Sequence, residues 1–211
     1  MKRTFTLVEL LVVTVIIGII VGATVPAFSR LMTGNAVSYG LRMTTSQLNM
    51  ARTEACARRR YVAVVFPADG FSATTSNIGY CSAFRSCYVT KNGDDNFKFE
   101  KWVPGTKWEY LPKGAYFSDL TKSETELDTI LPLKITGVDD EDGLLASGTH
   151  TIRAVIFSDS GRPAEKKTYK VKVSEGVVTD NHTVTRNNNT DNWLTAKVNL
   201  YTGSVRTVQP E

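Results

Sequence analysis

The chain has 211 residues, of which 42% are hydrophobic and 22% are charged. This balance is typical of a globular protein, and it excludes gross disorder, collagen-like repeats and a membrane protein with many spans. The formal net charge is +4, and two of the positive residues, Lys2 and Arg3, precede the first apolar run. The remaining chain is therefore close to neutral, which gives little support to a bulk nucleic-acid binder.

The first predicted element is a long apolar segment near the N-terminus. Twenty residues without a charge lie between Glu9 and Arg30. A helix of that length rises by about 30 Å, the thickness of the hydrocarbon layer of a membrane. Because Lys2 and Arg3 precede the segment, we expect a single membrane span with a cytoplasmic N-terminus and an exported remainder.

A short motif opens this segment. Residues 5–9 read FTLVE and follow a short basic leader. The combination resembles the class III signal of type IV prepilins and of type II secretion pseudopilins. The resemblance implies that a membrane-bound prepilin peptidase cuts between Thr4 and Phe5 and then methylates the new N-terminus of Phe5. Thr4 stands where that family usually has glycine.

Two other fates of the segment remain as alternatives. The residues Val25-Pro26-Ala27 are typical of a signal-peptidase site, and cleavage there would release a secreted β-domain that begins near Phe28. Without any cleavage, the segment would be a static membrane anchor. A signal core is usually about 7 to 15 residues long and follows basic residues. This run is longer and follows Glu9, so we favour the prepilin interpretation.

Glu9 is the acidic residue of the motif. A carboxylate in a membrane costs roughly 2.5 to 3.5 kcal/mol at the centre and less toward the ends, so we expect a partner to offset it. Cleavage would expose an amine on Phe5, one helical turn away and at the positive end of the helix dipole. The same amine on a neighbouring helix would also serve, and that pairing would set the register of assembly. The simpler alternative places Glu9 at the membrane interface, in contact with water.

The rest of the N-terminal region predicts a long helix. Gly18 and Gly22 lie one turn apart and would allow close approach of a second helix. Pro26 removes one helical hydrogen bond, so we expect the helix to be weakened between Gly22 and Pro26 and again at Gly34-Asn35. An apolar stripe then continues at three- and four-residue spacing through Leu41, Thr44, Leu48, Ala51 and Ala55. We predict one helix from about Phe5 to Arg58.

A β-rich domain follows. We predict strands at residues 61–66, 97–102, 108–111, 130–135, 152–157, 169–173 and 193–200, which are rich in β-branched and aromatic residues. In the last two, apolar and polar residues alternate, so that one face lies on a core and the other in water. The predicted fold class is α+β, a long N-terminal helix packed against an antiparallel β-sheet domain, as in the type IV pilin-like family.

The predicted organisation has four parts. Residues 1–4 are the leader, and residues 5–30 are the transmembrane or filament-core half of the helix. Residues 31–60 are its amphipathic half, and residues 61–211 form the β-rich domain, with a variable middle at about 67–151.

Three further motifs restrict the resemblance to a subgroup of the type IV pilin-like family. The helix ends with MARTEA at residues 50–55, one strand is followed by SDSGR at 158–162, and the last strand is followed by TGSVR at 202–206. These motifs are similar to those of H-type minor pseudopilins and their FimT-type pilin relatives. The resemblance implies a non-catalytic subunit that waits in the inner membrane with its domain outside the cytoplasm, and then joins a filament. Its implied partners are other pseudopilins or pilins, the prepilin peptidase and an inner-membrane assembly platform.

The sequence offers no sign of catalysis. It contains no GxxxxGK[ST], GxSxG or HExxH motif, and we expect neither a catalytic residue nor a cofactor. The two histidines, His150 and His182, have polar neighbours, so we expect them at the surface. The acidic run Asp139 to Asp142 is a candidate for calcium, but its spacing does not match an EF-hand and we favour a solvated loop without metal.

The chain has three cysteines, Cys56, Cys81 and Cys87. A bridge between Cys81 and Cys87 would close a short loop and contribute about 2 to 3 kcal/mol in an oxidising compartment. We favour that bridge, which leaves Cys56 as a small buried apolar residue. Pairing of Cys56 with either of the others remains an alternative, whereas a metal site lacks a fourth ligand.

DNA uptake is the alternative function that the FimT-type resemblance implies. That group carries a Gly-Arg-x-Arg element, and the corresponding stretch here, Gly203 to Arg206, has a single arginine. A basic face for phosphates would consist of Lys166, Lys167, Lys170, Lys172, Lys197 and Arg206. Alternating lysines are usually the solvated side of a strand, so nucleic acid is the less favoured partner.

Overall fold

The computed structural model describes most of the chain. The described residues are 7–66, 81–92, 97–118, 131–136, 149–164, 168–178, 184–186 and 192–209. Within them, residues 23, 25–34, 131–136, 149–151, 178 and 184–186 are described by their backbone alone. The fold is α+β with antiparallel sheets, as predicted.

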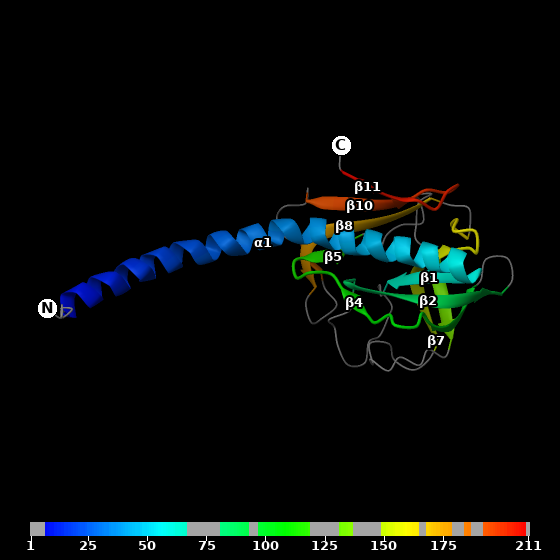
Figure 1. The fold of residues 1–211 in the computed structure, drawn as a ribbon, viewed down its shortest axis with the longest axis horizontal. Helices are drawn as coiled ribbons and strands as arrows, with labels where there is room; N and C mark the ends of the chain where they lie inside the picture. Colours follow the sequence, from blue (N-terminus) through cyan, green and yellow to red (C-terminus); the bar gives the residue numbers. More distant parts are fainter. Residues whose placement is uncertain are drawn as a thin grey trace.

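Helix α1 (Leu7–Arg58) is the first element, and its two halves have different surroundings. The N-terminal half projects from the domain, and the C-terminal half lies on it (Figure 1). The predicted stripe is buried, since Leu41, Thr44, Leu48, Ala51 and Ala55 are each at most 2% exposed. The backbone of α1 stays helical through Pro26 and through Gly34-Asn35.

The described strands form two antiparallel sheets. The first sheet has the order β3-β2-β1-β7-β6, with β4 paired to β2, and the second has the order β11-β10-β8-β5, with β9 paired to β8. The edge strands β3 and β6 also contact each other, so the first sheet curls. In chain order the strands are β1 (Tyr61–Phe66), β2 (Ala83–Lys91), β3 (Phe97–Trp102), β4 (Glu109–Tyr110), β5 (Ala115–Phe117), β6 (Leu131–Thr136), β7 (Thr149–Phe157), β8 (Tyr169–Val178), β9 (Val184–Arg186), β10 (Trp193–Val198) and β11 (Val205–Val208).

Two apolar cores hold these layers together. The larger core lies between α1 and the two sheets, and it includes Leu48 of the helix, Phe66 and Phe84 of the first sheet, and Tyr169 and Val171 of the second. Burying a side chain such as Leu48 contributes about 1.5 to 3 kcal/mol. The smaller core lies on the other face of the first sheet, where its members are Ala63, Val65, Ala83, Cys87, Val89, Phe97, Phe99, Trp108, Ile152, Ala154 and Ile156.

The C-terminal end of α1 is fixed by a backbone cap and a side-chain network. The N–H of Arg60 donates to the carbonyl of Ala55 at 3.2 Å, and Arg59 between them adopts a left-handed conformation with φ of 53°. This geometry is that of a Schellman cap. The hydroxyl of Tyr88 on β2 donates to the Glu54 carboxylate at 2.5 Å, which ties the helix end to the first sheet. Burial and the adjacent Glu54 raise the pKa of Tyr88 above its usual value.

Replacing Arg59 with glycine is expected to stabilise the domain by about 0.5 to 1 kcal/mol. Glycine adopts the left-handed conformation at this cap position without the steric cost that a side chain incurs, and that gain exceeds the added entropy of the unfolded chain. Urea unfolding followed by tryptophan fluorescence measures the change. Arg58→Gly, one position earlier and still helical, is the matched control and should destabilise by about 1 kcal/mol. A loss of stability in Arg59→Gly would contradict the cap assignment.

Candidate functional site

The projecting half of α1 is an apolar surface with little cover from the domain. Leu7 is 80% exposed, Leu10 is 64% exposed and Val21 is 53% exposed. Contiguous apolar surface of this kind is rare on soluble monomers and marks a site of interaction. We call this segment, residues 7–24 of α1, the stem. Its exposed large apolar side chains are Leu7, Val8, Leu10, Leu11, Val12, Val13, Val15, Ile16, Ile17, Ile19, Ile20 and Val21.

The part of the chain that the structure describes contains no helix with the length and hydropathy that a membrane span requires.

The stem has two distinct faces. Glu9 lies in the first turn of α1, where the helix dipole favours an acidic side chain. Gly18 follows nine positions later, so at about 100° per residue it lies on the opposite side of the helix from Glu9. A side chain at Gly18 or Gly22 would meet no atom within 4 Å, which leaves the small-residue face open. A helix that packs on the glycines is therefore a different neighbour from one that contacts Glu9.

The two threonine side chains of the stem are satisfied within the helix. The hydroxyl of Thr14 donates to the carbonyl of Leu11 at 2.9 Å, and the hydroxyl of Thr24 donates to the carbonyl of Ile20. A hydroxyl that bonds its own helix backbone needs no further partner in apolar surroundings. The predicted cleavage residues Thr4 and Phe5 lie outside the described part of the chain, and Pro26 is described by its backbone alone.

The three motifs that narrowed the resemblance meet at one junction near the end of α1. The Nε atom of Arg52 on α1 donates to the carbonyl of Gly161 at 3.2 Å. A Cβ atom at Gly203 would lie 1.9 Å from the same carbonyl oxygen, and one at Gly161 would lie 2.5 Å from the Sγ atom of Cys56. Both glycines have positive φ. The turn after β7 and the turn after β10 therefore touch each other and the helix.

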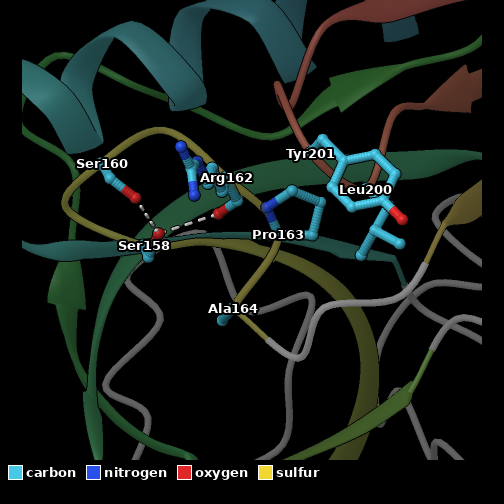
Figure 2. Close-up of a pocket in the computed structure, with 7 residues that line it drawn as sticks. All are labelled: Ser158, Ser160, Arg162, Pro163, Ala164, Leu200 and Tyr201. Carbon is cyan, nitrogen blue, oxygen red and sulfur yellow. Dashed lines mark hydrogen bonds between the residues drawn. The ribbon is translucent and has the colours of Figure 1, made fainter.

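A pocket of about 450 Å³ lies beside this junction, between the two turns (Figure 2). The hydroxyl of Ser158 is 3.0 Å from that of Ser160 and donates to the carbonyl of Arg162 at 3.0 Å. Among the described residues that line the pocket there is no histidine and no carboxylate. Its lining residues are Ser158, Ser160, Arg162, Pro163, Ala164, Leu200 and Tyr201.

The pairing and the burial of the cysteines differ from the prediction. Cys87 is a free thiol, so the favoured Cys81–Cys87 bridge is not formed. Residues 83–87, most of the predicted loop, instead belong to β2. A strand advances by about 3.3 Å per residue, which separates positions that a bridge would bring together. Cys56, expected to be buried, is exposed. Burial raises the pKa of Cys87 far above its ordinary value.

We expect alkylation to distinguish these thiols. Under reducing conditions near pH 8, iodoacetamide should label Cys56 in the folded chain and leave Cys87 unmodified, because a thiol with a strongly raised pKa forms little reactive thiolate. Raising the pH to 9 should still leave Cys87 protected, whereas unfolding in urea should allow its labelling. Peptide mass spectrometry assigns each adduct. Equal rates for the two residues in the folded chain would contradict the buried position of Cys87.

The outer face of the second sheet gathers basic residues. Lys197 of β10 lies directly opposite Arg206 of β11 on one side and Lys170 of β8 on the other. Lys172 places its Nζ atom 4.2 Å from the ring centre of Trp193. The candidate residues Lys170, Lys172 and Arg206 therefore share one face of the sheet. The sequence analysis did not include Trp193 among the residues of this face. Its position on the outward side of an alternating strand could have indicated it.

Several candidates lie beyond what the structure describes. His182, the acidic run at 139–142, Lys166 and Lys167 are outside the described ranges, and His150 is described by backbone alone. In the described ranges, no three His, Cys, Asp or Glu side chains come together as a metal site.

Comparison with known proteins adds a likeness of fold. No known family model and no curated protein matches the sequence. A solved structure with a similar fold is the type IV minor pilin FimU of Pseudomonas aeruginosa. The TM-score is 0.43 and the sequence identity 10%, and the superposition covers 84% of this chain and 90% of FimU.

Proposed function

We propose that this chain is a structural subunit, a minor pseudopilin or pilin, that the prepilin peptidase processes and that assembles through the stem into a filament. The type II secretion pseudopilus is the favoured filament, and a type IV pilus-like fibre is the other. The observation that carries the proposal is that one continuous helix has an exposed apolar half and a half packed on the domain. The motif FTLVE at residues 5–9 precedes and enters that exposed half.

The two faces of the stem support assembly with several neighbours. Because Glu9 and Gly18 lie on opposite sides of the helix, contacts on both faces require two different neighbouring helices. Neighbours on different faces give head-to-tail contacts instead of a closed pair, and such contacts build an open helical filament wherever the rotation between subunits does not close a ring. The threonine hydroxyls bonded within the helix suit burial of the stem among other helices or in lipid.

The proposed route begins in the inner membrane. Residues 5–30 would cross it once, with the N-terminus in the cytoplasm and the domain outside, until an assembly platform adds the subunit to a filament. The partners proposed for this route are the prepilin peptidase, that platform and other pilin-type subunits. The proposed role needs no catalytic residue and no cofactor.

Mass spectrometry of the mature chain tests the proposal. Processing by the prepilin peptidase removes four residues and adds a methyl group at Phe5. Loss of 27 residues would instead indicate a secreted domain, and an intact N-terminus would indicate a static anchor. Either of these two results would refute the proposed filament role, because the amine on Phe5 would not exist.

DNA binding is the second candidate function, and the row of Lys170, Lys197 and Arg206 on the second sheet favours it. Two observations count against DNA binding: the basic row is narrow, and one arginine of the Gly-Arg-x-Arg element is absent. A filter-binding titration across salt separates the two functions. Phosphate contacts predict a steep loss of affinity with rising salt, and Arg206→Ala should reduce that slope by about one. Weak binding without this slope would leave filament assembly as the function.

A further inference from the structure

Strand β11 ends the second sheet with an edge that no described strand pairs with. The sheet order is β11-β10-β8-β5, so β10 occupies one edge of β11 only. Arg206, Thr207 and Val208 are exposed. An unpaired strand edge presents a row of N–H and C=O groups that another extended chain can bond.

The register shows which backbone groups point to that edge. The N–H of Asn199 donates to the carbonyl of Ser204 at 2.9 Å, which makes these two residues a hydrogen-bonded pair. Hydrogen-bonded and non-hydrogen-bonded pairs alternate in an antiparallel ladder, so Arg206 and Val208 bond to β10. The N–H and C=O groups of Val205 and Thr207 therefore point to the open edge.

The side chains beside this edge carry like charges. Lys197 and Arg206 are exposed and lie directly opposite each other on the outer face. Like charges in directly opposite positions destabilise a sheet, and a single charge is enough to discourage chance pairing along an edge. An acidic side chain on the far side of Arg206 would relieve this repulsion.

We propose that the β11 edge binds an extended segment of a partner protein in which an acidic residue alternates with apolar residues. Arg206 forms a non-hydrogen-bonded pair on that side, where opposite side chains approach most closely, so the acidic residue lies opposite Arg206. Its two neighbours lie opposite Val205 and Thr207 and point to the inner face, where Val205 packs against the core. Hydrogen bonds to Val205 and Thr207 supply affinity, and Arg206 with Lys197 supplies selectivity.

Such a segment fits the surface better than a nucleic acid does. The basic residues form one row that runs across the strands and ends at the β11 edge, beside backbone groups that no described strand pairs with. Phosphate oxygens can accept hydrogen bonds from the N–H groups of a strand edge but cannot bond its C=O groups, whereas an extended peptide bonds both. The inference does not depend on the filament role, because the edge belongs to the domain and not to the stem.

A binding measurement on the full chain in neutral detergent tests the proposal. The probe is a capped synthetic peptide of about ten residues in which glutamate alternates with valine and threonine, long enough to form a strand. The control peptide has lysine in place of glutamate. We expect the glutamate peptide to bind at least about tenfold more tightly. Arg206→Glu should reverse this preference.

Thr207 provides a matched pair of variants. Thr207→Pro removes the N–H that points to the open edge and leaves the bonds to β10 intact, so the domain should fold, as circular dichroism can verify. We expect this variant to weaken peptide binding at least about tenfold, and Thr207→Val, which keeps the N–H, to leave it nearly unchanged. Equal binding by Thr207→Pro and the parent chain, or no binding of the peptide, would overturn the proposal. If an oligonucleotide bound more tightly than the peptide and Thr207→Pro did not weaken its binding, the proposal would also be overturned. The basic row would then be a surface for nucleic acid.

Discussion

Gly203→Ala is expected to destabilise the domain by about 3 to 5 kcal/mol, a large part of the stability of a typical domain. A Cβ atom at this position would lie 1.9 Å from the carbonyl oxygen of Gly161, which is backbone and cannot rotate away. The φ of Gly203 is 66°, so a side chain adds conformational strain to the clash. The turn after β10 would have to move away from the turn after β7, and with it from the end of α1.

Gly105→Ala is the matched control for that prediction. Gly105 also has a positive φ, of 78°, but a Cβ atom there would meet nothing within 4 Å. We therefore expect a cost of about 1 kcal/mol from conformational strain alone. Urea unfolding followed by tryptophan fluorescence compares the two variants. Similar losses in both would show that the two turns do not pack as closely as the structure places them.

Local periodicity explains which parts of the fold could be predicted from the sequence. Strands β1 and β3 begin and end at the predicted residues, because their β-branched and aromatic runs are bounded by clear turn residues. The outward lysines of β8 and the buried Ala196 and Val198 of β10 follow from alternation. The predicted strand at 193–200 ends at Val198, because Asn199 turns the chain and its side chain accepts hydrogen bonds from Tyr201 and Thr202.

Strand β2 could not be predicted in the same way. Its residues 83–91 include Arg85 and Ser86, which interrupt any simple apolar pattern, and the pair Cys81 and Cys87 suggests a closed loop instead. Both polar residues bond distant partners, since the guanidinium of Arg85 donates to the carbonyl of Thr106 and the Ser86 hydroxyl accepts from Gln47 of α1. Such long-range partners have no signature in the local sequence.

The junction of the two turns shows the same limit. The motifs around Arg52, Gly161 and Gly203 were recognised in sequence, yet nothing in their spacing indicates that they touch. Contact arises because β7 and β10 belong to different sheets that both pack against α1. Pairing of strands far apart in the chain depends on the whole core and not on any single segment.

Glu9→Ala is expected to leave membrane insertion and cleavage intact and to abolish filament assembly. A carboxylate in apolar surroundings is tolerated only with a compensating charge, and the methylated amine of Phe5 on a neighbouring subunit supplies it in the proposed filament. Removing one partner of a buried ion pair costs about 3 to 5 kcal/mol, because the other charge is left unpaired. That cost corresponds to a loss of roughly a hundredfold or more in the affinity of each added subunit.

Leu10→Ala is the matched control, because Leu10 is adjacent in the same turn and is 64% exposed. It removes apolar bulk from the stem without removing a charge, so filament yield should fall only slightly. Shearing and sedimentation of filaments, followed by immunoblotting, compare the two variants, and mass spectrometry verifies that both are processed. Glu9→Gln separates charge from shape, because the amide fills the same space but cannot pair with an amine as an anion. Normal assembly of Glu9→Gln would refute the ion-pair argument, since the face of the stem that carries Glu9 would then be recognised by packing alone.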